Sequence, residues 1–63
     1  MLYPLTPAAA CIIDSPRNLD WANNAQLAYA LRIAADLEGG RINAARFYIR
    51  RALRARGYDG EIL

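Results

Sequence analysis

The strongest alternation of hydrophobic and polar residues lies between Gly40 and Gly57. At about 100° per residue, the apolar side chains of this stretch fall on one side of a helix and most of its arginines on the other. The apolar side holds Ile42, Ala45, Ile49, Ala52 and Leu53, and the polar side holds Asn43, Arg46, Arg50, Arg51 and Arg54. The pattern predicts one amphipathic helix over residues 41–56.

A glycine marks the end of this helix. Gly57 stands where a left-handed residue commonly follows a helix, and Tyr58 and Leu53 occupy the positions whose apolar contact accompanies a Schellman motif. We therefore expect the helix to end at Arg56.

A second, longer helix is expected over about residues 16–38. Ser15 can serve as its N-cap with Pro16 in the first helical position, and Gly39-Gly40 can end it. Its apolar residues cover more than half of the helix circumference, which is more than one neighbouring helix can bury. Asn23-Asn24 is the weak point because asparagine disfavours a helix interior, and a break there would give three helices from the same residues.

The N-terminal stretch MLYPLTPAAACII is apolar and contains two prolines. Thr6 as N-cap and Pro7 in the first position predict a short helix up to Ile13, with an extended segment as the alternative. Together these elements predict an all-α fold in one domain of residues 1–63. Its main part is a helical hairpin of two long helices, about 16–38 and 41–56.

The length of the chain indicates that it associates with itself. A domain of 63 residues buries only about 60% of the surface that its unfolded chain exposes, so its core is marginal. One cysteine and no histidine leave neither a disulfide nor a zinc site to supplement that core, and we expect a homodimer instead. The residues expected at the oligomer interface are Trp21, Tyr29, Leu27 and Leu31.

The net charge of +2 hides an uneven distribution. Residues 1–40 carry two arginines and four acidic residues, whereas residues 41–63 carry six arginines and two acidic residues. This asymmetry indicates a basic surface for an anionic partner, although a helix face that contacts only water in an arginine- and alanine-rich chain would show the same pattern. The absence of lysine does not discriminate between partners, because guanidinium groups bind carboxylate and phosphate alike.

Two classes of function fit this basic surface. The first is a small regulatory or inhibitory protein that binds an acidic surface of a partner protein through its helices, with aromatic and arginine side chains as anchors. The second is a nucleic-acid-binding regulator in which the basic helix 41–56 contacts the nucleic acid as a recognition helix. Two features argue against nucleic-acid binding: one long helix would precede the recognition helix, and few basic residues lie elsewhere to contact the phosphate backbone. A structural subunit of a larger assembly is a third alternative. The candidate partner-binding residues are Arg46, Arg50, Arg51, Arg54, Asn43 and Phe47.

The side chains that catalysis requires are scarce. The sequence has no histidine, one serine at a predicted helix start and one cysteine, Cys11, in an apolar run. It also has no phosphate-binding loop, dinucleotide fingerprint or calcium loop, so we expect no enzymatic activity, cofactor or metal. The first residues lack the basic start of a secretory signal, and no membrane span is evident, so we expect a cytoplasmic location.

Overall fold

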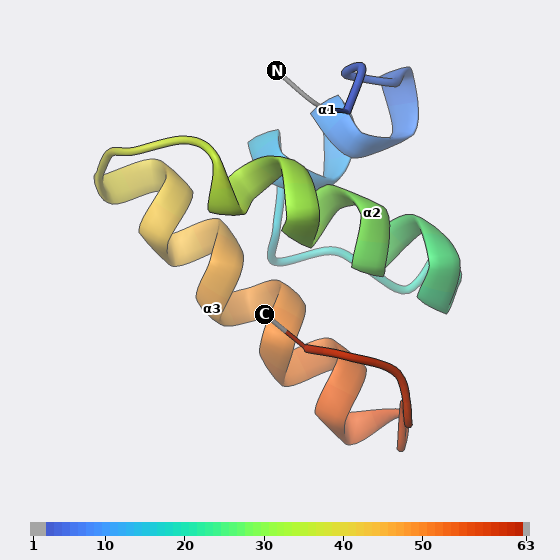
Figure 1. Cartoon of the computed structure of the whole chain (residues 1–63). Coiled ribbons are helices and arrows are strands. Elements are labelled where there is room, and N and C mark those ends of the chain that lie inside the picture. The colour runs from blue at the N-terminus through green and yellow to red at the C-terminus, as the bar shows by residue number, and fades with distance from the viewer. Residues whose placement is uncertain (1–2, 63) are drawn as a thin grey trace.

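The computed structural model describes residues 3–62 (Figure 1). It contains three helices, α1 over Pro7–Asp14, α2 over Asn24–Ala35 and α3 over Gly40–Ala55. Every regular element among the described residues is a helix, which confirms the all-α fold class. In Figure 1, α2 lies between α1 and α3, and the chain reverses after α2 so that α3 runs back alongside it.

α1 begins where the sequence predicts. The side-chain oxygen of Thr6 accepts a hydrogen bond from the N–H of Ala9 at 3.2 Å, and Pro7 occupies the first turn. Both residues suit a helix start, since the threonine satisfies a free backbone donor and the proline has no N–H to satisfy. The N-terminal element is therefore a short helix rather than an extended segment, and it ends at Asp14.

The predicted helix over residues 16–38 is wrong. Ser15 is the C-cap of α1 and not an N-cap, because its N–H donates to the carbonyl oxygen of Cys11 at 2.9 Å. Residues 15–23 form turns and irregular chain, which we call the connecting loop. The structure thus has three helices in place of a hairpin of two long ones.

A capping box explains the late start of α2. The side-chain oxygen of Asn23 accepts from the N–H of Gln26 at 2.8 Å, and that of Gln26 accepts from the N–H of Asn23 at 2.9 Å. Asparagine favours this position because its short side chain bonds backbone donors that a helix start leaves free. The alternative of a break at Asn23-Asn24 is therefore correct, although turns rather than a further helix precede it.

α2 also ends earlier than predicted. Its last residue is Ala35, with Asp36 as C-cap, whereas the sequence pattern extended to Glu38. Asp36 already lies at the negative end of the helix dipole, and a longer helix would place the carboxylate of Glu38 there as well, which is unfavourable. Gly39 then adopts a φ of +127°, a conformation that glycine reaches without steric cost, and the chain enters α3.

The end of α3 confirms the predicted Schellman motif. Gly57 has a φ of +70° and its N–H donates to the carbonyl oxygen of Arg54 at 3.1 Å. The N–H of Tyr58 donates to the carbonyl oxygen of Leu53 at 3.0 Å, and the Tyr58 side chain packs against the core. These two hydrogen bonds define the motif and place the helix end within one residue of Arg56.

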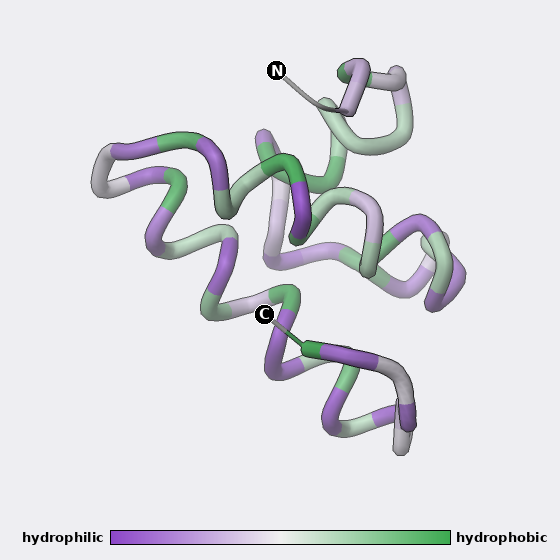
Figure 2. The backbone as a smooth tube through the Cα atoms, in the orientation of Figure 1, coloured by the Kyte–Doolittle hydropathy of each residue, from purple (hydrophilic) through white to green (hydrophobic). Residues whose placement is uncertain are grey.

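The core is one cluster to which all three helices and the connecting loop contribute. Its buried members are Ala9, Ile12, Leu19, Ala22, Leu27, Ala30, Leu31, Ile33, Ile49 and Leu53. Among residues 3–62, no polar or charged residue is buried. Figure 2 shows hydrophobic and hydrophilic residues following each other around the turns of α3, as burial of one side of a helix requires.

Candidate protein-binding face on α3

The outer side of α3 results from the way its inner side packs. Ala45, Ile49 and Leu53 are fully buried, which confirms the apolar side predicted for this helix. Residues half a turn away must then point to solvent. We call the set Asn43, Arg46, Phe47, Arg50, Arg51 and Arg54 the arginine face, and it contains every residue predicted to bind a partner.

Phe47 is the unusual member of the arginine face. Its side chain is 58% exposed, although most of the other large apolar side chains of α3 are covered. It lines a shallow groove of about 490 Å³ together with Arg50, Arg51 and Arg54. An exposed aromatic ring bordered by three guanidinium groups combines the two residue types that contribute most to protein interfaces.

A second aromatic ring supports Phe47 from the side. The rings of Phe47 and Tyr48 meet edge to face, with centroids 5.5 Å apart and planes at 77°. The guanidinium of Arg17, on the connecting loop, lies 5.7 Å from the centroid of the Tyr48 ring. A positive charge at this distance from an aromatic face is attracted to it, so the loop brings a further arginine against Tyr48, the neighbour of Phe47.

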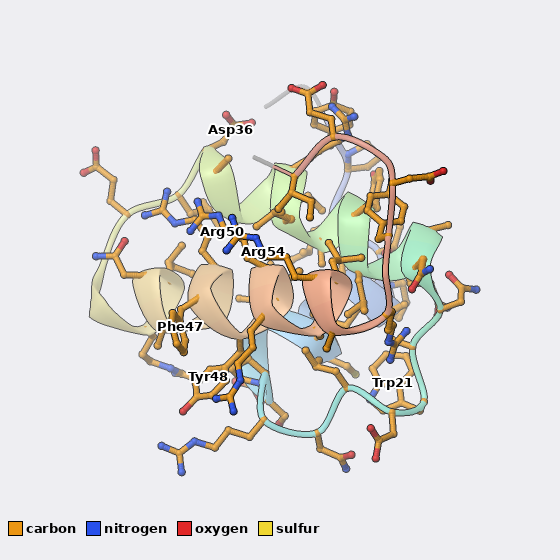
Figure 3. The ribbon with its side chains drawn as sticks, turned by 90° about the horizontal axis from the view of Figure 1, so that it is seen from below. Trp21, Asp36, Phe47, Tyr48, Arg50 and Arg54 are labelled. Atoms are coloured by element: carbon orange, nitrogen blue, oxygen red, sulfur yellow. The ribbon has the colours of Figure 1, made fainter. Side chains whose placement is uncertain are left out.

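Three arginines of α3 form a row along the helix. Arg46 donates a hydrogen bond to the side-chain oxygen of Asn43, which orients its guanidinium along the helix. In Figure 3, Arg50 and Arg54 project from the side of α3 that faces Asp36, and Tyr48 projects from the opposite side. Arg46, Arg50 and Arg54 follow one another at intervals of four residues, a spacing at which like charges destabilise a helix by about 0.2–0.5 kcal/mol per pair.

The residues predicted for an oligomer interface are separated by the structure. Leu27 and Leu31 lie in the core and are covered within a single chain. Tyr29 is half-buried, packs edge to face on Tyr3 at 5.8 Å, and donates a hydrogen bond to the carbonyl oxygen of Pro4 at 2.6 Å. Trp21 is 51% exposed on the connecting loop. Of the four, only Trp21 is largely accessible to a second molecule.

The sequence pattern does not predict two surface grooves, because each is lined by segments that only the tertiary structure brings together. A groove of about 590 Å³ lies between this loop and α3, and its lining includes Arg17, Tyr48, Arg51 and Arg56. A smaller apolar groove lies between the ends of α1 and α2 and the start of α3. Only the basic character of Arg17 and Arg56 was visible in the sequence, and their positions beside α3 were not.

The other chemical groups of the described residues add no site. The thiol of Cys11 is exposed and free. No three histidine, cysteine, aspartate or glutamate side chains within residues 3–62 are grouped so that they could hold a metal ion. None of the helices in this part of the chain has the length and apolar character needed to cross a membrane. Comparison with protein-family models, curated proteins and solved structures gave no match.

Proposed function

We propose that this chain is a small regulatory or inhibitory protein that docks the arginine face of α3 on an acidic surface of a partner protein. The observation that carries the proposal is Phe47, a ring 58% exposed and bordered by Arg50, Arg51 and Arg54. An apolar anchor next to several hydrogen-bonding cations suits a partner that offers both an apolar pocket and neighbouring carboxylates.

Binding of nucleic acid is the competing proposal, and one argument against it has disappeared. Two short helices precede α3, as they do in helix-turn-helix modules, where the sequence pattern suggested one long helix. Two other observations still favour a protein partner. α3 runs back alongside α2 in Figures 1 and 3 instead of crossing it steeply, and an exposed phenylalanine lines the same groove as three of the arginines.

The test compares variants of the arginine face in affinity capture from a lysate, with and without nuclease. We expect nuclease-resistant capture of a protein by the native chain. Phe47→Ala and the triple Arg46→Gln, Arg50→Gln, Arg54→Gln variant should lose it. Trp21→Ala and Arg41→Gln are the matched controls, since each alters an exposed residue of the same type outside the face. Circular dichroism should show that all four variants keep the native helix content.

A direct titration separates the two partner classes. Fluorescence anisotropy with a labelled DNA duplex at 50 and 200 mM salt should show weak binding that does not depend on Phe47. Phosphate binding through several arginines would instead lose orders of magnitude in affinity over this salt range, and the triple glutamine variant would abolish it. Tight, salt-sensitive binding of the DNA duplex that needs the arginines but not Phe47 would contradict the proposal of a protein partner and support a nucleic acid instead.

A further inference from the structure

A second surface lies away from the arginine face. It is an apolar groove of about 380 Å³, bounded by the segment before α1, the last turn of α1, the turn after α2 and the first turn of α3. We call it the neutral groove and define it by Leu5, Ile13, Leu37 and Ile42 with Asp14 and Arg41. It shares no residue with the arginine face.

The neutral groove concentrates exposed apolar surface. The described residues expose four large apolar side chains, and two of them, Leu5 at 56% and Leu37 at 36%, line this groove. Ile13 and Ile42 are only partly buried there. In a chain whose core is marginal for its length, covering these side chains would add to the surface that folding removes from water.

Two opposite charges border the neutral groove. Arg41 donates from Nη2 to the Oδ1 of Asp14 at 2.7 Å, and both side chains stay largely open to water. The border therefore carries one positive and one negative charge. Among the residues that line the groove, the charges that a second copy would meet cancel, whereas two arginine faces would repel each other.

The Asp14–Arg41 pair can face a second copy of itself with opposite charges in contact. In a two-fold dimer the same patch is used twice, so that each residue of a contacting pair meets the other residue of the pair on the second chain. A two-fold axis through the neutral groove would set Asp14 of one copy opposite Arg41 of the other, and the four charges would then alternate in sign. The apolar side chains of both copies would meet between them.

We infer that the neutral groove is where two copies of this chain associate as a two-fold dimer. A standard interface removes about 800 Å² from each partner. The chain exposes 4139 Å² in total, so such an interface would take about one fifth of its surface and extend beyond the groove onto its borders. The dimer leaves both arginine faces open, and its formation is independent of the function proposed above.

Sedimentation equilibrium over a range of about 1 to 500 µM tests the apolar part of this inference. The native chain should show a reversible monomer–dimer equilibrium. Leu37→Asp, in a turn outside the core, should weaken the dimer at least tenfold, and circular dichroism should show native helix content. Phe47→Asp is the matched control, since it places the same charge on another exposed apolar residue, which belongs to the arginine face. Its dimer should be as stable as the native one.

Reversing the charge of Asp14 or of Arg41 tests whether the two residues pair across the dimer. Asp14→Arg alone and Arg41→Asp alone each give a groove border of one sign, and each variant should be monomeric. An equimolar mixture of the two should form a heterodimer, because arginines of one chain then face aspartates of the other. Arg54→Asp has the same net charge as Arg41→Asp and, mixed with Asp14→Arg, should give no heterodimer.

A native chain that stays monomeric at 500 µM would overturn the inference. So would a dimer that Phe47→Asp dissociates and Leu37→Asp does not, or a mixture of charge variants that fails to associate. Either of the last two results would show that the dimer forms through another surface. A monomeric native chain, or charge variants that fail to associate, would leave capture of a partner by the arginine face unaffected, so the two proposals can fail separately.

Discussion

Arg56, at the end of α3, donates a hydrogen bond from Nη2 to the backbone carbonyl oxygen of Leu19 at 2.8 Å, across 37 residues of sequence. Its Nη1 donates to the carbonyl oxygen of Ala22 at 2.6 Å. Both carbonyl groups belong to the connecting loop, and that of Leu19 also accepts from the N–H of Ala22 at 3.1 Å. One guanidinium therefore holds the irregular part of the chain against the longest helix, with Leu19 and Ala22 in the core.

We expect Arg56→Lys to lower the free energy of unfolding by about 1–2 kcal/mol, because an ammonium group cannot span both carbonyl oxygens as the planar guanidinium does. Urea denaturation followed by circular dichroism measures the change, and Trp21 fluorescence reports whether the loop around it loosens. Arg54→Lys, on the exposed side of the same helix turn, should change stability by less than about 0.5 kcal/mol. Equal effects of the two substitutions would contradict a special role for Arg56.

The inner side of α3 should be the most sensitive part of the fold. Ile49→Ala and Leu53→Ala each remove a fully buried side chain from the core, and we expect each to cost roughly 2–4 kcal/mol. In a domain this small such a loss is a large part of the total stability. Phe47→Ala, two residues before Ile49 and on the outer side, should leave the thermal midpoint nearly unchanged. An unchanged midpoint for both core variants would show that the helix packs with its other side inward.

The capping box at the start of α2 gives a third prediction. Asn23→Ala removes the acceptor for the Gln26 N–H and should cost about 1 kcal/mol. Chemical denaturation checks the value, and Asn18→Ala in the same loop is the control, with an expected change below about 0.5 kcal/mol. If the two substitutions were equivalent, the capping box would not be what starts α2.

The hydrogen bond between Tyr29 and the N-terminal segment gives a fourth prediction. Tyr29→Phe deletes the hydroxyl that donates to the carbonyl oxygen of Pro4 but keeps the ring against Tyr3. The expected loss is small, about 0.5–1 kcal/mol, since water can replace the hydroxyl at an exposed carbonyl. Faster cleavage of the N-terminal segment in limited proteolysis should accompany it. Tyr58→Phe is the matched control, and a similar effect there would remove the significance of the Tyr29 hydrogen bond.

The sequence predicts the helix ends correctly where hydrogen bonds between neighbouring residues fix them. Thr6 with Pro7 starts α1, and Gly57 with Tyr58 ends α3, because each motif satisfies backbone groups of its own neighbours in the chain. Ser15 and Pro16 look like the same start signal and fail. The preceding helix extends to Asp14 and uses the Ser15 N–H as a cap, so that residue cannot also begin a new helix.

The sequence by itself determined that the chain is helical, that α3 is amphipathic and which of its sides carries the arginines, because a repeat of 3.6 residues and local capping depend only on neighbours along the chain. The tertiary structure decided the rest. It buried Leu27 and Leu31 within one chain, tied the connecting loop to Arg56, and brought Leu5, Leu37 and the Asp14–Arg41 pair together around one groove. The hydrogen bonds of Arg41 to Asp14 and of Arg56 to Leu19 join residues 27 and 37 positions apart. No periodicity along the sequence encodes contacts that only the packing of three helices creates.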